Sequence, residues 1–299
     1  QRLPNAVPQL GSAEWLRVPE LTRDDLQQFR AELRAERVPA EHGRVAETRT
    51  SGSTGQPVSV LRTSLNQLLW EAFTLREHLW HERDVSLSKA VIRANGPRAR
   101  PPEGRRFDGW GRPFDRLWPC GPAFALDMTT DPAAQADWLR KIRPAYLLTY
   151  PTNLEALLAH FAERDAPPML EVICIGETTT DRLRRRCKEV LGADLVASYS
   201  SQELGYMALQ CPDCRQYHVQ SESVVLEVLA EDGTPCSPGE TGRVVVTDLH
   251  NFAMPLIRYA IGDYAEAGDP CSAGRHLPSL RRVLGRRRNM IVFPDGRTH

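Results

Sequence analysis

Alternating strands and helices in the middle of the chain decide the fold class. The stretch is residues 145–200, AYLLTYPTNLEALLAHFAERDAPPMLEVICIGETTTDRLRRRCKEVLGADLVASYS. Its short apolar runs lie at residues 145–149, 170–175 and 194–198. Apolar residues recur at helical spacing between these runs, which predicts an α/β fold with a parallel sheet covered by helices on both faces. Ligands of such sheets bind beyond the carboxyl ends of the strands, and here those positions are residues 150–152, 176–178 and 199–203.

The segments before this stretch carry further helical signals. Residues 65–80 and 133–142 have apolar residues at helical spacing, and Thr22 is a candidate N-cap for a helix that continues to residue 36. Residues 44–62 look extended on either side of a run of Ser, Thr and Gly. Residues 95–122 are rich in Gly, Pro and Arg, which predicts a long loop.

The pattern changes after residue 220. Residues 224–229 and 243–247 are β-like, and the turn-rich sequence EDGTP at 231–235 lies between them. This arrangement predicts a hairpin, and with it a smaller β-rich subdomain after the α/β part.

Composition and charge exclude some classes of partner. The 299 residues include 38 basic and 38 acidic side chains, so the formal net charge is zero, which argues against nucleic acid as the main partner. No apolar run approaches the roughly 20 residues that span a bilayer, and no signal-peptide pattern opens the sequence. We expect a cytoplasmic protein with no membrane partner.

The seven cysteines do not form the dense pattern of a disulfide framework. Cys120, Cys174 and Cys187 stand alone and are expected to be reduced thiols. Cys211 and Cys214 form a C-x₂-C pair that His218 follows, and Cys271 lies 53 residues further on. Four nitrogen and sulfur ligands suit a closed tetrahedral zinc site, but spacing alone leaves free thiols as an equal alternative.

Residues 50–55, TSGSTG, combine hydroxyl groups with glycines in one turn. Exposed amides and hydroxyls can surround phosphate oxygens, and glycines allow the backbone to approach them closely. The lysine of a Walker P-loop is missing, which argues against a standard P-loop NTPase. On composition alone a flexible loop is the alternative.

Four segments in order resemble the adenylate-forming superfamily of acyl- and aryl-CoA ligases. They are SGSTGQP at 51–57, SYSSQE at 198–203, IRYAIGD at 257–263 and GRRRNM at 285–290. The stretches AMPLIRY at 253–259 and PCSAGR at 270–275 are similar to the phenylacetate–CoA ligase branch. The resemblance implies the fold of the large N-terminal domain of these enzymes over residues 1–284, with an α/β core to about 210 and the β-rich subdomain over about 211–284. Residues 285–299 would be the hinge to a C-terminal lid domain that this sequence does not contain.

The resemblance also assigns roles to individual residues. Glu203 would ligate Mg²⁺ and, with Thr54, take part in catalysis; Asp263 would accept hydrogen bonds from the ribose hydroxyls of ATP; Arg286 would assist at the ribose or phosphates. Tyr199 would stack on the adenine. The phosphate contacts would come from Ser51, Gly52, Ser53, Thr54 and Gly55, and the remaining nucleotide-binding positions would be Gly176, Glu177, Ser198, Ser200 and Gln202.

The same resemblance implies that Cys211, Cys214, His218 and Cys271 hold a structural zinc ion. Relatives usually have two cysteines near position 271, and Ala273 occupies the second place here, so Cys214 would replace that ligand. Gln202 stands where a Thr or Ser is usual, and Arg288 where the hinge usually has an aspartate. The chain ends at His299, just beyond the hinge, and none of its three lysines resembles the lysine that the lid supplies for adenylation.

The expected function is therefore ATP-dependent activation of a carboxylic acid, aromatic or apolar, followed by transfer to coenzyme A. Tyr150 could border the acid pocket or lie in the core. An amine or a carrier-protein thiol as acceptor is an alternative. A nucleotide-binding module without a lid and a zinc-stabilised interaction domain are further alternatives. The oligomeric state stays open, with a homodimer among the possibilities.

Overall fold

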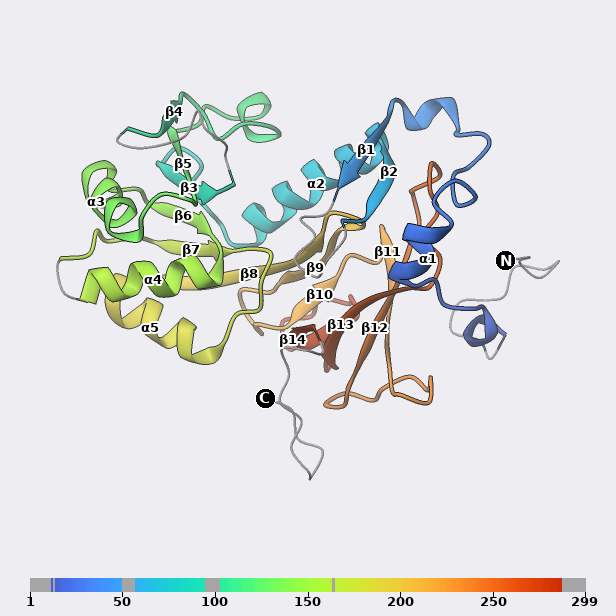
Figure 1. Cartoon of the computed structure of the whole chain (residues 1–299). Helices are drawn as coiled ribbons and strands as arrows, with labels where there is room; N and C mark the ends of the chain where they lie inside the picture. Colours follow the sequence, from blue (N-terminus) through green and yellow to red (C-terminus); the bar gives the residue numbers. More distant parts are fainter. Residues whose placement is uncertain (1–11, 13, 50–56, 95–102, 163–164, 287–299) are drawn as a thin grey trace. The chain divides into compact units, whose positions relative to one another are not determined.

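The computed structural model of the chain describes residues 12, 14–49, 57–94, 103–162 and 165–286 (Figure 1). The chain divides into two compact units. We call Glu71–Tyr199 the α/β unit, and Gln1–Trp70 together with Ser200–His299 the β-rich unit.

A mainly parallel sheet forms the centre of the α/β unit. Its strands follow the order β8-β7-β6-β3-β5-β4, in which β4 alone among these six is antiparallel to its neighbour. Their bounds are β3 Lys89–Arg93, β4 Arg105–Phe107, β5 Ala123–Asp127, β6 Tyr146–Thr149, β7 Glu171–Cys174 and β8 Asp194–Ser201. Helices α3 (Pro132–Ile142), α4 (Pro151–Ala162) and α5 (Asp181–Leu191) connect them, and α4 packs against both others. The predicted parallel sheet with flanking helices is confirmed.

Local sequence signals explain where these helices begin and end. Asp131 caps α3 by accepting a hydrogen bond from the amide of Ala133 at 2.9 Å, and Pro132 occupies the first turn. Thr180 caps α5, which ends at Gly192 in the left-handed conformation that glycine adopts readily.

The strand register sets the two edges of the parallel sheet. Lys89, Tyr146, Glu171 and Asp194 pair across four neighbouring strands at the amino edge. The loops that begin at Tyr150 and Ile175 therefore leave from the opposite, carboxyl edge, where the sequence predicts ligand-binding residues.

Antiparallel strands dominate the β-rich unit. Strands β1 (Val45–Arg49) and β2 (Ser59–Thr63) form a pair by themselves. The other strands follow the order β11-β12-β13-β14-β10-β9. Their bounds are β9 Gly205–Gln210, β10 Tyr217–Val219, β11 Val224–Leu229, β12 Thr241–Asp248, β13 Tyr259–Ala267 and β14 Ser279–Arg286. The predicted hairpin of residues 224–229 and 243–247 is confirmed as β11 and β12.

The first two helices differ in part from the prediction. Thr22 does cap a helix, but α1 is Arg23–Gln28 and residues 29–33 form turns, so the predicted extension to residue 36 is wrong. Helix α2 is Ser64–Trp80, as its periodicity indicates. Leu68 and Leu79 on this helix are nevertheless exposed, whereas Glu77 and His78 are buried.

The segment 95–122 is not a single loop. Of its described residues, β4 pairs with β5, and a short 3-10 helix covers Phe114–Arg116. Within the part of the chain that is described, no helix has the length and apolar character needed to cross a bilayer.

Candidate functional site

Glu203 lies in the tight connection between β8 and β9. Its side chain is only 5% exposed, although it carries a carboxylate. The hydroxyl of Ser201 accepts a hydrogen bond from the amide of Leu204 at 3.1 Å and shapes this turn. A buried carboxylate needs hydrogen bonds or cations around it, because burial strips it of water.

Two guanidinium groups of the β-rich unit supply this compensation. Nη1 of Arg23, the first residue of α1, lies 3.7 Å from Oε1 of Glu203. Arg62 on β2 donates from Nη1 to the carbonyl of Gln202 at 3.3 Å. Burial lowers the pKa of Arg62, and the carboxylates of Asp248 and Glu203 act in the opposite direction. Glu203 therefore lies in a positively charged environment.

Gly205 allows Arg62 to reach this turn. The glycine has φ +80°, and a Cβ atom there would lie 2.9 Å from Nη2 of Arg62. The backbone conformation favours glycine at this position, and a larger residue would also have to displace the end of the Arg62 side chain. Strand β2 begins at Ser59, shortly after the predicted phosphate loop in the sequence, and its Arg62 contacts the Glu203 turn.

Asp263 and Arg286 form an ion pair across β13 and β14. Nε of Arg286 lies 3.0 Å from Oδ1 of Asp263, and its Nη1 donates to the carbonyl of Ile261 at 2.6 Å. Gly262 has φ +85°, and a Cβ atom there would lie 2.8 Å from Nη1 of Arg286. Two residues that the resemblance assigns to the ribose are thus in direct contact.

Tyr259 connects the two groups of charges. Its side chain is fully buried at the start of β13. Burial raises the pKa of its hydroxyl and Glu203 adds to the effect, whereas Arg23 and Arg286 oppose it. Glu203, Arg23 and Arg286 therefore all lie within electrostatic reach of one phenol. Parts of the motifs at 198–203, 257–263 and 285–290 lie in the β-rich unit. The described residues of these parts converge around Tyr259.

The predicted positions in the α/β unit lie on two loops at the carboxyl edge of its sheet. Glu177 accepts hydrogen bonds from the amide and the hydroxyl of Thr152, each at 3.0 Å. Gly176 has φ +75°, and Tyr150 would lie 3.2 Å from a Cβ atom there. Tyr150 is half-buried and packs against this glycine, so it borders the loop of Gly176 and Glu177.

The remaining predicted residues divide into two sets. Ser198 and Tyr199 are buried near the end of β8, and Ser200 is half-buried next to them. The phosphate-loop residues Ser51, Gly52, Ser53, Thr54 and Gly55 lie outside the described residues.

The predicted metal ligands form a cluster in the β-rich unit. One donor atom from each of Cys211, Cys214, His218 and Cys271 lies within 4.8 Å of all the others. Cys214 Sγ is 3.6 Å from His218 Nε2 and 3.5 Å from Cys271 Sγ. Burial raises the pKa of Cys214 to about 12. A cation would reverse this effect, because the thiolate is the form that binds a metal.

Arg275 packs against the same cluster. It donates from Nη1 to Cys211 Sγ at 3.1 Å and to Asp213 Oδ2 at 2.6 Å. Burial lowers the pKa of His218, Arg275 lowers it further, and a hydrogen bond with the backbone of Leu277 opposes both. A neutral imidazole and deprotonated thiolates are the forms that metal coordination requires.

Sequence reasoning missed Arg23, Arg62 and the buried phenol of Tyr259. Tyr259 stands inside the quoted motif IRYAIGD, next to Arg258 and four positions before Asp263, and an aromatic residue in this motif is a usable signal. Nothing in the pattern around Arg23 or Arg62 separates them from the other arginines of the chain. Their proximity to Glu203 depends on tertiary structure.

Comparisons with known proteins agree with this architecture. No family model matches the sequence. The chain is 29% identical over 188 residues to the phenylacetate-coenzyme A ligase of Thermus thermophilus, which is 58% of this chain and 42% of that relative. The chain thus spans less than half of the relative's length.

Solved structures show the same fold. The structure of 2-hydroxyisobutyryl-CoA ligase in an open conformation with 2-HIB-AMP and CoA matches with a TM-score of 0.71 and 19% identity, over 95% of this chain and 67% of that one. The same ligase in its postadenylation state matches with a TM-score of 0.73 and 18% identity, over 96% of this chain and 62% of that one.

Proposed function

Because this chain resembles the phenylacetate–CoA ligase branch of the adenylate-forming enzymes in sequence and acyl-CoA ligases in fold, we infer that it takes part in ATP-dependent activation of a carboxylic acid. A carboxylate oxygen would attack the α-phosphorus of ATP and pyrophosphate would leave. The thiol of coenzyme A would then attack the acyl carbon and AMP would leave. An aromatic or apolar acid is the substrate class that the resemblance favours.

The observation that carries this proposal is the grouping of Glu203, Tyr259, Asp263 and Arg286 in one unit. Asp263 would exchange part of its contact with Arg286 for the ribose hydroxyls, which are neutral donors that a carboxylate accepts well. Arg286 would then turn its rigid donor fork toward the nucleotide. As the resemblance implies, Tyr199 would stack on the adenine, and Gly176 and Glu177 would be further nucleotide-binding positions.

Glu203 has the chemistry of a magnesium ligand. It is a buried carboxylate that already has a cationic group 3.7 Å away, so a cation fits this position. When bound, Mg²⁺ would neutralise the phosphates and draw charge from the leaving pyrophosphate. Ser51, Gly52, Ser53, Thr54 and Gly55 would hold the β- and γ-phosphates, and Ser198, Ser200 and Gln202 would complete the nucleotide contacts.

We further propose that Cys211, Cys214, His218 and Cys271 bind a structural zinc ion. Three sulfurs and one nitrogen within 4.8 Å of one another match a closed tetrahedral site, which leaves no open position for catalysis. Such a site needs reduced thiols, which fits a cytoplasmic protein. Residues 285–299 would act as the hinge, as the resemblance implies.

Exchange of labelled pyrophosphate into ATP, scanned over a panel of aromatic, aliphatic and hydroxy acids, tests the activation step. We expect exchange that depends on the acid and on Mg²⁺, and that Asp263→Ala slows strongly at ATP concentrations that do not saturate the variant. Addition of coenzyme A, an amine or a carrier-protein thiol would then identify the acceptor from the release of AMP. Exchange without any acid, or its full retention in Asp263→Ala, would contradict the proposal.

A further inference from the structure

Arg23 and Arg62 both lie near Glu203 and outside the adenylation motifs, and the guanidinium of Arg23 forms an ion pair with the carboxylate. The side chain of Arg23 is 20% exposed, whereas that of Glu203 is 5% exposed. The 3.7 Å separation is an ion pair without the short contact of a bidentate bridge. A guanidinium in this position can neutralise the carboxylate and still leave it.

The backbone around Arg23 is fixed to the strand that carries Asp263. Leu21 donates from its amide to the carbonyl of Arg258 at 3.0 Å, and the amide of Ala260 donates to the carbonyl of Leu21 at 2.8 Å. Thr22 and Asp25 then form a capping box that begins α1 at Arg23. The backbone is therefore held in place both before Arg23, by the hydrogen bonds of Leu21, and at the start of its helix, by the capping box.

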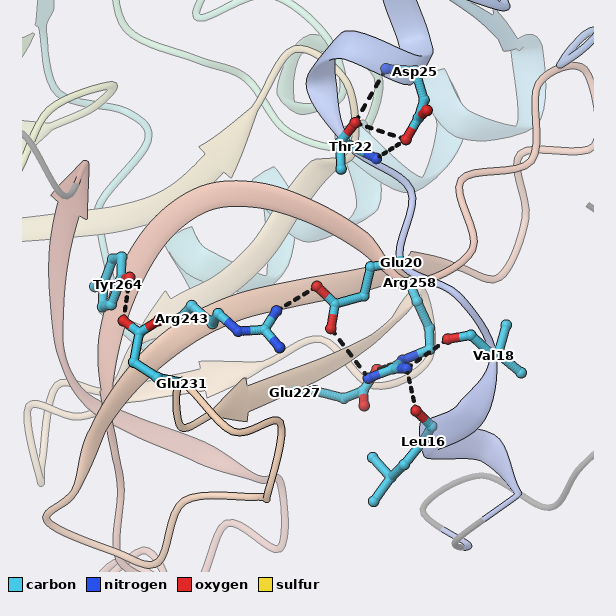
Figure 2. A network of polar contacts seen from close by, with 10 residues as sticks. All are labelled: Leu16, Val18, Glu20, Thr22, Asp25, Glu227, Glu231, Arg243, Arg258 and Tyr264. Carbon is cyan, nitrogen blue, oxygen red and sulfur yellow. Dashed lines mark hydrogen bonds and ion pairs between the residues drawn. The ribbon is translucent and has the colours of Figure 1, made fainter.

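Arg258 holds the preceding segment, as Figure 2 shows. Its Nη1 donates to the carbonyls of Leu16 at 2.8 Å and Val18 at 2.6 Å. Its other nitrogens pair with Glu20 at 3.7 Å and Glu227 at 3.2 Å. Arg258 is 2% exposed and has φ +48°, a conformation that a non-glycine residue adopts only where the surroundings impose it. We call residues 15–28, which these contacts fix, the N-terminal strap.

We propose that Arg23 is a positioning residue that stands in for the divalent cation at Glu203. The inference rests on the proposed function. Without metal, the guanidinium neutralises the buried carboxylate and keeps it turned toward the nucleotide site. When Mg²⁺ binds with ATP, Glu203 would exchange the partly exposed guanidinium of Arg23 for the ion. Of the N-terminal strap, Arg23 is in this way the residue that reaches the nucleotide site.

Arg23 and the metal ion can therefore each neutralise the carboxylate of Glu203 in the absence of the other. Without either cation, only Arg62 still offsets the charge of Glu203, and the remaining negative charge repels the four negative charges of metal-free ATP. With Mg²⁺ bound, the loss of Arg23 leaves no uncompensated charge. The cost of removing Arg23 should therefore appear only without metal.

Equilibrium binding of ATP, measured by calorimetry in EDTA and again in excess Mg²⁺, tests this. We expect Arg23→Gln to weaken ATP binding at least tenfold in EDTA and less than threefold in Mg²⁺. Arg23→Lys, which keeps the charge, should behave like the wild type in both buffers. The double variant Arg23→Gln/Glu203→Gln should regain the wild-type affinity in EDTA, because the repelling charge is gone. Arg17→Gln, the same change at an exposed position of the strap, is the matched control.

Each contrary result has a distinct meaning. Equal losses in both buffers would show that Arg23 is structural or contacts phosphate directly, and would overturn the stand-in role. A wild type that binds ATP only with Mg²⁺ would overturn it as well, since Arg23 could not then substitute for the ion. A wild type that binds ATP in neither buffer would refute the proposed function, and this inference with it.

Discussion

Lys89 begins β3 at the amino edge of the parallel sheet, with its ammonium group buried. Its Nζ lies 4.4 Å from the centre of the Trp110 ring and 5.7 Å from that of Phe114. Burial lowers the pKa of Lys89 to about 8, and the neighbouring Arg83 and Arg93 lower it further, whereas Glu77 acts in the opposite direction. The aromatic faces attract the cation but only partly replace water.

This lowered pKa makes stability depend on pH. Since the unfolded chain keeps Lys89 protonated up to about pH 10.5, it binds more protons than the folded chain between pH 8 and 10.5. The penalty for burying the charge is thus fully present below pH 8 and disappears as the pH rises through this window. We expect Lys89→Met to raise the free energy of unfolding by about 1–3 kcal/mol at pH 7, and the gain to vanish by pH 10.5.

Urea denaturation of the wild type and Lys89→Met at several pH values measures this difference. A difference that stays constant from pH 7 to 10.5 would mean that Lys89 does not titrate in this window.

Asp263 should control how the protein recognises ribose. A charge-assisted hydrogen bond contributes about 1.5–3 kcal/mol, so Asp263→Ala should weaken ATP binding roughly 10- to 100-fold. The wild type should bind 2′- and 3′-deoxy-ATP less tightly than ATP, and Asp263→Ala should bind all three alike. Calorimetry with the three nucleotides provides the measurement. Asp269→Ala, which removes an exposed carboxylate paired with Arg281, is the control. If Asp263→Ala still bound ATP more tightly than the two deoxy nucleotides, the result would show that Asp263 does not recognise the ribose hydroxyls.

At the level of elements, the metal cluster joins β9, β10 and the loop after β13. We expect one zinc ion per chain by elemental analysis, and none in Cys214→Ser. Because a ligand that binds only the folded state stabilises it, the loss of zinc should lower the free energy of unfolding by about 3–4 kcal/mol or more. Cys236→Ser, which changes a cysteine outside the cluster, should keep both the zinc and the stability. A metal-free wild type with unchanged stability in chelator would contradict the zinc assignment.

The capping box of α1 makes a separate prediction. The hydroxyl of Thr22 accepts from the amide of Asp25 at 3.1 Å, and Oδ2 of Asp25 accepts from the amide of Thr22 at 2.8 Å. Thr22→Ala should lower the free energy of unfolding by about 0.5–2 kcal/mol, and Thr22→Ser should restore most of it. Equal stability of the alanine and serine variants in thermal denaturation would show that the cap does not hold α1.

Sequence patterns predict these elements well where packing follows local periodicity. Strands β6, β7 and β8 and the hairpin of β11 and β12 appear where the apolar runs and turn residues place them, whereas these patterns do not predict β3, β4 and β5. Helix α2 shows where this fails. Its apolar pattern predicts the helix, but tertiary contacts bury Glu77 and His78, and two of its leucines stay exposed. Buried Glu77 forms an ion pair with Arg83 at 3.7 Å. Arg83 lies beyond the end of α2, so the apolar pattern of the helix does not reveal this contact.

For the molecule as a whole, the sequence motifs predict which residues form the candidate site. They do not predict which charged side chains surround those residues. The four metal-ligand candidates span residues 211–271 and come together because β10 pairs with both β9 and β14. The spacing of the cysteines suggests this cluster before the structure is known. Arg23 and Arg62 lie 180 and 141 residues before Glu203, and the fold alone brings them to it.

The proposed function requires that the substrate carboxylate is activated through a mixed anhydride with AMP. The most direct measurement uses a substrate acid labelled with ¹⁸O in its carboxylate, together with ATP, Mg²⁺ and coenzyme A. Because a carboxylate oxygen attacks the α-phosphorus and stays there when the thiol attacks the acyl carbon, we predict one ¹⁸O atom in the AMP that is released. Label in inorganic phosphate, or the release of unlabelled AMP, would contradict the account.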